Sequence, residues 1–145
     1  HAVRVDTGKI GKVEAPHATS VGKAIMAWLP EDEIKRILAS GMKRFTDKTI
    51  TELPALLESL RIVRRNGYAI DREEYLPGVI CVGAAIRDQA GTVIGAISAS
   101  TPTMRASDEH IALMRDQITA ATRGLSAEFG EPGSQNGERP HAVAN

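Results

Sequence analysis

A thiol and two hydroxyls share one face of two neighbouring strands between Gly67 and Ser100. Side chains alternate between the two faces of a β-strand. One face therefore collects small side chains: Cys81, Gly83 and Ala85 in the first strand, and Ala96, Ser98 and Ser100 in the second. If the two faces coincide, they form a floor with nothing bulky above it. An ordinary core would fill that space with large apolar side chains, so the pattern indicates the wall of a pocket.

Two carboxylates lie just before this floor. Asp71 can accept a hydrogen bond from a ligand hydroxyl or a water. Glu74 is three positions away, so in a strand it would point to the opposite face, which argues against a carboxylate pair for acid–base catalysis. We therefore interpret Glu74 as structural or exposed. Cys81, in an apolar strand without a visible base, resembles an inert small side chain more than a nucleophile.

The sequence offers little support for other chemistries. Its four histidines and one cysteine show no close metal-ligand spacing, and there is no GxSxG, P-loop or correctly placed GxGxxG motif. We interpret His17 as capping a helix or packing a loop rather than binding a ligand. A dense basic cluster, Arg61, Arg64 and Arg65, falls at a helix end, where solvated cations complement the helix dipole; a phosphate contact is the alternative interpretation. No metal and no cofactor is predicted.

Composition excludes several classes of protein. The chain of 145 residues fits one domain, and its 18 basic and 18 acidic residues leave no net charge to attract nucleic acid or an anionic membrane. One cysteine excludes an intrachain disulfide and fits a reducing compartment. Without a long apolar run or a signal-peptide pattern, we predict a cytoplasmic protein without membrane contact.

The elements that position the floor follow from periodicity and capping. The predicted strands are 3–5, 9–13, 68–74, 79–88 and 92–100, and the predicted helices are 20–29, 31–40, 52–66 and 107–129. Thr19 or Ser20 can cap the first helix. This order indicates an α+β domain with a mostly antiparallel sheet and helices on at least one face. After Phe129 the chain is rich in Gly, Pro and polar residues, so residues 130–145 are predicted to be disordered.

Four segments together resemble a known family. They are HATSVGKAIMAWLP (17–30), FT with TIT (45–51), GYAIDREEYLPGVICVGAAIRD (67–88), and GAISAS with PTMR (95–105). In this order, over residues 1–129, they resemble the effector-binding domain of the IclR family of bacterial transcription regulators. The resemblance implies a GAF-like α+β fold with a mostly antiparallel central sheet flanked by helices. One position departs, because Arg87 stands where the family usually has an aromatic residue or His. We expect Arg87 to point outward beside the turn.

What the resemblance implies about function is a sensing domain rather than an enzyme. Such a domain would bind a small organic effector, such as an organic acid, sugar acid or aromatic acid, to control a catabolic operon. We expect a winged helix-turn-helix domain upstream of this chain, through which alone operator DNA would be bound, and assembly of the chain with itself as a dimer or tetramer. The alternative hypothesis is a small cytoplasmic enzyme that uses Cys81 or Asp71.

The resemblance also implies an effector site, made by the residues at the positions that contact the effector in the family. They are Ser20, Val21 and Gly22 at the first helix, Asp71, Val79 and Cys81 in the long motif, and Ser98 and Ser100 in the last strand. A helix start offers unpaired N–H groups that favour a carboxylate. Because no Arg or Lys occupies these positions, we expect capture by neutral donors. We interpret Lys23 as solvated and Trp28 as a core residue.

Overall fold

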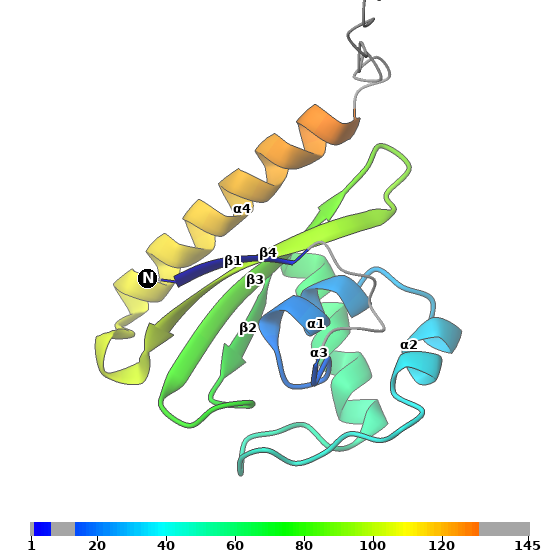
Figure 1. The fold of residues 1–145 in the computed structure, drawn as a ribbon, viewed down its shortest axis with the longest axis vertical. Helices are drawn as coiled ribbons and strands as arrows, with labels where there is room; N and C mark the ends of the chain where they lie inside the picture. Colours follow the sequence, from blue (N-terminus) through cyan, green and yellow to red (C-terminus); the bar gives the residue numbers. More distant parts are fainter. Residues whose placement is uncertain (1, 7–13, 131–145) are drawn as a thin grey trace, which may run out of the picture.

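The computed structural model describes residues 2–6 and 14–130, and side chains from 14 to 129. The elements are β1 (Ala2–Asp6), α1 (Ser20–Met26), α2 (Glu31–Ile37), α3 (Leu53–Asn66), β2 (Ala69–Arg72), β3 (Val79–Arg87), β4 (Val93–Pro102), the 3-10 turn η2 (Thr103–Arg105) and α4 (Asp108–Gly130) (Figure 1). This is the predicted α+β class. The strand predicted at 9–13 and residues 131–145 of the predicted tail lie outside the described residues.

The sheet is antiparallel, with the strand order β1-β4-β3-β2. Residues directly opposite each other in neighbouring strands point to the same face. In β3 and β4 the opposed pairs include Cys81 with Ser100, Gly83 with Ser98, and Ala85 with Ala96. The two small-residue faces predicted from alternation therefore coincide, and the prediction of a shared floor is confirmed.

The opposite face of the sheet carries a large apolar core. Alternate residues of β3 and β4, namely Val82, Ala84, Ile86, Ile97 and Ala99, pack in one buried cluster with Ile111, Met114 and Ile118 of α4. The apolar residues of α4 recur at helical spacing, so one stripe of the helix faces the sheet. In Figure 1, α4 runs along one side of the sheet while α1, α2 and α3 gather on the other.

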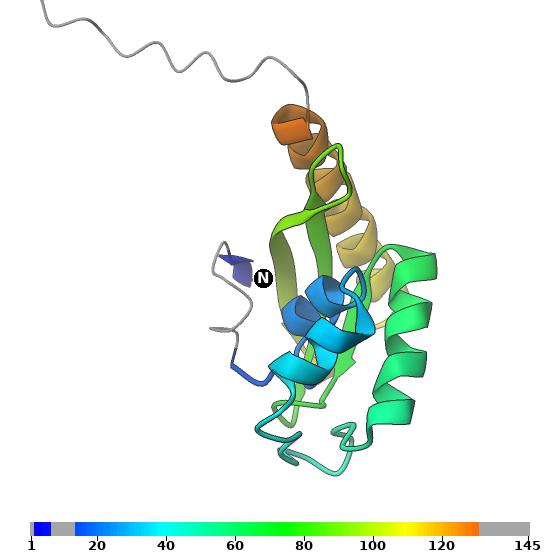
Figure 2. The same cartoon turned by 90° about the vertical axis from the view of Figure 1, so that its right-hand side faces the viewer.

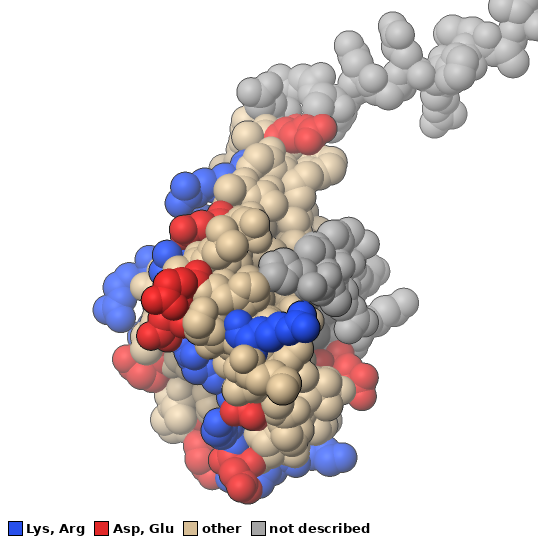
Figure 3. Space-filling view, turned by 90° about the vertical axis from the view of Figure 1, so that its left-hand side faces the viewer, with Lys and Arg blue, Asp and Glu red and all other residues tan. Residues whose placement is uncertain are grey.

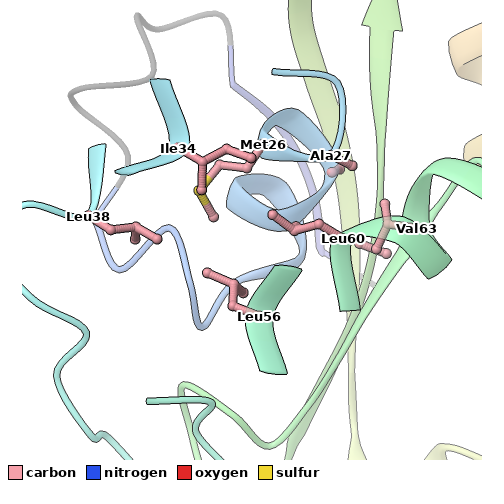
Figure 4. Packing of buried hydrophobic residues seen from close by; sticks show 9 residues of the cluster. Met26, Ala27, Ile34, Leu38, Leu56, Leu60 and Val63 are labelled. Atoms are coloured by element: carbon pink, nitrogen blue, oxygen red, sulfur yellow. The ribbon is translucent and has the colours of Figure 1, made fainter. Parts of the chain in front are cut away.

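The helices on the floor side have a core of their own. Met26 and Ala27 of the α1 end, Ile34 of α2, and Leu56, Leu60 and Val63 of α3 are buried against one another (Figure 4). Gly67, in the left-handed conformation at φ 81°, ends α3, and its N–H donates to Val63 O. Figure 2 shows α1 and α2 in front of the sheet, with α4 behind it.

A glycine lets α1 approach the floor closely. A Cβ atom on Gly83 would lie 2.9 Å from Ser20 Oγ and 3.0 Å from the Ser20 carbonyl carbon. The contact with Oγ is shorter than real Cβ contacts, so Ser20 would have to shift if position 83 carried a side chain. The first turn of α1 is therefore seated directly on the row that also contains Ser98.

Candidate functional site

Three polar side chains form one row across the sheet. Asp71 in β2 is opposite Cys81 in β3, which is opposite Ser100 in β4. Asp71 is buried, whereas Cys81 and Ser100 are half-buried. Ser98 lies in the next row, opposite Gly83. Alternation predicted that Cys81, Ser98 and Ser100 share this patch of sheet, and the register adds Asp71 to it.

The start of α1 covers part of this patch. Thr19, not Ser20, caps the helix: its Oγ1 accepts a hydrogen bond from the Gly22 N–H at 3.2 Å. Ser20 is the first helical residue, and its buried side chain lies against Gly83. Val21 and Gly22 are also buried, and Gly22 packs so tightly on the backbone of Pro16 that no larger residue fits there. The predicted residues of α1 are therefore held rigidly in place.

Val79 lies at the edge of the patch. It is the first residue of β3, half-buried, and opposite Pro102. Because Val79 is two positions from Cys81 in the same strand, its side chain points to the same face as the thiol. It can supply an apolar wall next to the polar row.

Lys23 is not solvated, and Glu74 is not exposed. Only 3% of Lys23 is exposed, and its Nζ donates to Glu74 Oε1 and to Ile70 O, each at 2.7 Å. Glu74 is 8% exposed, and its second carboxylate oxygen accepts from the Arg72 N–H at 3.0 Å. The prediction of a solvated Lys23 was wrong, and of the two interpretations of Glu74, structural or exposed, the structural one holds. They form a buried, hydrogen-bonded ion pair adjacent to Asp71.

The expectation that Glu74 points away from Asp71 failed because the strand ends earlier than predicted. β2 stops at Arg72, and Glu73 adopts a left-handed backbone at φ 59°. Alternation between faces holds only in an extended strand, so it does not apply across Glu73. The chain turns back, and the Glu74 N–H donates to Asp71 Oδ1 at 2.7 Å. In sequence, the only hint was that Lys23 interrupts an otherwise small and apolar run, VGKAIM.

The environment shifts the pKa of two residues in the polar row. Burial raises the pKa of Asp71 to about 6; the Glu74 N–H opposes the rise, the Glu74 charge adds to it, and Lys23 opposes it. Burial, with a contribution from Asp71, raises the pKa of Cys81 to about 11. Cys81 therefore remains a neutral thiol at neutral pH, which disfavours nucleophilic chemistry.

His17 packs a loop, as expected from the sequence, and does not cap α1. The ring is buried, its Nε2 lies 2.8 Å from Lys43 O, and it contacts the ring of Phe45, which in turn meets Tyr75 edge-on. Nearby, Thr49 Oγ1 donates to Glu74 O at 2.6 Å. The segment of residues 43–49 therefore fixes the turn that carries Glu74.

Of the arginines considered in the sequence, Arg87 differs from its expected position. Arg87 does not point outward: it is half-buried, and its guanidinium carbon lies 3.5 Å from the ring centroid of Trp28. Arg64 is exposed, as predicted for a solvated helix end, and its Nε also donates to Ala27 O at 2.7 Å, which ties α3 to the end of α1. Trp28 is partly buried against the core of the three helices, as predicted. Arg61 is an exposed side chain paired with Glu58.

The described residues contain no cluster of three or more His, Cys, Asp or Glu side chains that could hold a metal ion. Among them there is also no helix of sufficient length and apolarity to cross a membrane. On the face shown in Figure 3, acidic and basic side chains are interspersed, with no large region of one sign. The polar row combines the buried carboxyl group of Asp71 with the half-buried thiol of Cys81 and hydroxyl of Ser100.

Comparison with known proteins identifies relatives along nearly the whole chain. The family model for the bacterial transcriptional regulator IclR C-terminal domain matches residues 2–127. The HTH-type transcriptional regulator BhcR of Paracoccus denitrificans is 43% identical over 131 residues, which cover 89% of this chain and 46% of that protein. KdgR of Escherichia coli is 38% identical over 84% of this chain and 47% of its own length. The chain thus spans about half the length of these relatives.

Solved structures agree with this assignment. The C-terminal domain of E. coli KdgR matches with a TM-score of 0.74 and 38% identity, over 80% of this chain and 71% of that one. A double mutant of the inducer-binding domain of the transcription factor PobR from Acinetobacter, in complex with 3-hydroxybenzoic acid, matches with a TM-score of 0.67 and 29% identity, over 80% of this chain and 65% of that one. By sequence and by fold, the chain belongs to the IclR family of bacterial transcriptional regulators, and it corresponds to their C-terminal domain.

Proposed function

We propose that this domain senses a small organic acid and that the acid binds over the polar row on the sheet. The observation that carries the proposal is the register that places Asp71, Cys81 and Ser100 in line, next to the first turn of α1. The proposed contacts are Ser20, Val21, Gly22, Asp71, Val79, Cys81, Ser98 and Ser100. That the similar PobR domain was solved with 3-hydroxybenzoic acid supports a carboxylic acid as the ligand class.

The chemistry of the patch suits a carboxylate held by neutral donors. The hydroxyls of Ser98 and Ser100 can donate hydrogen bonds. The backbone N–H groups of Ser20 and Val21 have no acceptor within the described part of the chain. Lys23 is the nearest buried cation, but Glu74 already neutralises it. A ligand carboxylate would therefore meet hydroxyl and amide groups rather than form an ion pair.

Asp71 allows the patch to form a second kind of hydrogen bond with the ligand. When ionised, it can accept a hydrogen bond from a ligand hydroxyl, and when protonated it can donate one to a ligand carboxylate. Its raised pKa makes both forms accessible in a mildly acidic range. A hydroxy acid would satisfy the hydroxyls and Asp71 at once.

We also propose that the domain binds its ligand without transforming it. A neutral Cys81 thiol lacks nucleophilic power, and the carboxylate beside Asp71 belongs to Glu74, which is occupied by Lys23 and the Arg72 N–H. In the whole protein, which we place in the bacterial cytoplasm, an upstream winged helix-turn-helix domain would bind operator DNA, and the domains would assemble as dimers or tetramers. Ligand binding would then shift the arrangement of the paired DNA-binding domains, with a coupling of about 1–3 kcal/mol.

The test is a thermal-shift screen of the chain with small carboxylic, hydroxy and sugar acids, including 3-hydroxybenzoate. A ligand at about 100 times its Kd stabilises the fold by about 2.7 kcal/mol. We expect Asp71→Ala and Ser100→Ala to reduce that shift. Ser59→Ala, which removes a half-buried hydroxyl on α3, is the control and should retain it. Undiminished shifts in both site variants would show that the ligand binds elsewhere.

A further inference from the structure

A cleft opens at the other end of α1, away from the polar row. Its volume is about 660 Å³, within the range of small-molecule sites. The residues that define its chemistry are Trp28, Arg64, Arg65, Arg87, Asp88 and Arg123. None of these belongs to the proposed acid-binding patch. Ser20 begins α1 at that patch, whereas Trp28 follows the end of α1 at this cleft.

The sheet topology produces this cleft. β2 pairs only with residues 80–83 of β3, so within the described part of the chain residues 84–87 have no strand on that side. The end of α3 and the second half of α4 flank the open edge instead. The Arg87 N–H donates to Ser126 Oγ of α4 at 3.2 Å, which holds the helix to the strand edge. The cleft is therefore bounded by fixed elements rather than by loose side chains.

Its charge is strongly unbalanced. Four arginines line the cleft against a single acidic residue, Asp88. The Asp88 carboxylate is already engaged, because its Oδ1 accepts from the Ala90 and Thr92 N–H groups, each at 2.9 Å. None of the four arginines forms an ion pair with a carboxylate of the described residues. Other exposed basic residues of the described structure fall into both groups: Arg61 and Lys48 are paired with carboxylates, whereas Arg36 and Arg105 are not.

Two of these arginines are held in position before any ligand binds. The Arg87 guanidinium carbon lies 3.5 Å from the Trp28 ring centroid, and that of Arg64 lies 5.9 Å from it. Arg64 is further fixed by its bond to Ala27 O. A guanidinium stacked on an aromatic ring retains its N–H groups for an anion, and its fork matches the oxygens of a phosphoryl group. Little side-chain freedom would be lost on binding.

We propose that this cleft binds a small molecule bearing a phosphoryl group, as a second ligand site on the domain. Four guanidinium groups that line one cleft match a multiply charged anion better than a monocarboxylate. The concave shape favours a small ligand over the backbone of a nucleic acid duplex. The chain also has no net charge, so no long-range field would draw DNA to this face.

Trp28 is the single tryptophan of the chain, so its fluorescence reports on this cleft directly. The experiment titrates the chain with inorganic pyrophosphate as the probe and with sodium chloride at matched ionic strength. We expect a saturable fluorescence change with pyrophosphate only. Arg123→Gln should weaken binding about tenfold or more, since it removes a charge-assisted contact. Arg36→Gln, which removes an exposed arginine of α2, is the matched control and should bind normally.

Arg87→Gln changes the surroundings of Trp28 itself, so its affinity is measured by calorimetry and should also fall about tenfold or more. Ser100→Ala should bind pyrophosphate normally, which separates this site from the acid-binding patch. Three outcomes would overturn the proposal. They are the absence of a saturable change, an equal change with chloride, and displacement of pyrophosphate by a random duplex oligonucleotide at lower concentration, which would indicate a nucleic acid site.

Discussion

The buried ion pair between Lys23 and Glu74 makes a sharp prediction about stability. Lys23→Met keeps the length of the side chain and removes its charge. The Glu74 carboxylate would then lie buried with the Arg72 N–H as its remaining recorded donor. Removing one partner of a buried pair costs about 3–5 kcal/mol, because the other charge stays desolvated. For a domain of this size, that corresponds to a fall in Tm of roughly 10 °C.

The assay is urea unfolding followed by circular dichroism, on single and double variants. Lys23→Met combined with Glu74→Gln should be less destabilised than the sum of the two single variants, because no uncompensated charge remains. Lys35→Met is the control. It removes an exposed lysine paired with Glu31 one turn away on α2, and a solvated pair of this kind contributes little.

The reasoning would be refuted if Lys23→Met were as mild as Lys35→Met. That result would mean that water reaches the pair and that the burial of Lys23 does not hold in solution. Additivity of the single variants would equally refute the coupling between the two charges.

Two further predictions concern the floor. Because the folded-state pKa of Asp71 is raised from 3.8 to about 6, the folded state binds more protons than the unfolded state between these values. The favourable contribution of Asp71 is thus complete below about pH 4 and lost as the pH rises through about 6, a difference of up to about 3 kcal/mol. The free energy of unfolding, measured from about pH 4 to about pH 6, should fall in the unmodified chain but not for this reason in Asp71→Asn. The same dependence on pH in both proteins would contradict the prediction. Gly83→Ala should destabilise the domain by about 1–3 kcal/mol and abolish ligand-induced stabilisation, since its Cβ would displace Ser20. Gly124→Ala on α4, with open space around it, should instead stabilise by about 1 kcal/mol in the same urea assay.

Local patterns in the sequence predicted much of the fold. Alternation in β3 and β4 separated Val82 and Ala84 from Cys81 and Gly83, and the structure places these pairs on opposite faces as predicted. Such patterns succeed because side chains in a strand point to alternate faces of the sheet, so residues of one kind recur at every second position. The family resemblance rested on the same segments, and the comparisons confirm it. The individual ligand contacts remain predictions.

The errors have a common cause. Arg87 was expected to point outward because it lies beside a turn, but its position is decided by Trp28, which reaches it from another element. The open edge of β3, and with it the arginine-lined cleft, depends on β2 being four residues long. Neither feature is encoded within a short window of sequence.

The sequence alone thus determined which residues share a face, the α+β class and the family, because these depend on periodicities that short segments express by themselves. Tertiary structure alone decided that Lys23 meets Glu74, 51 residues away, and that Arg64, Arg87 and Arg123 line one cleft. The physical reason is that the burial of a charge is set by what packs around it. In this domain, those neighbours come from helices and strands far apart in the chain.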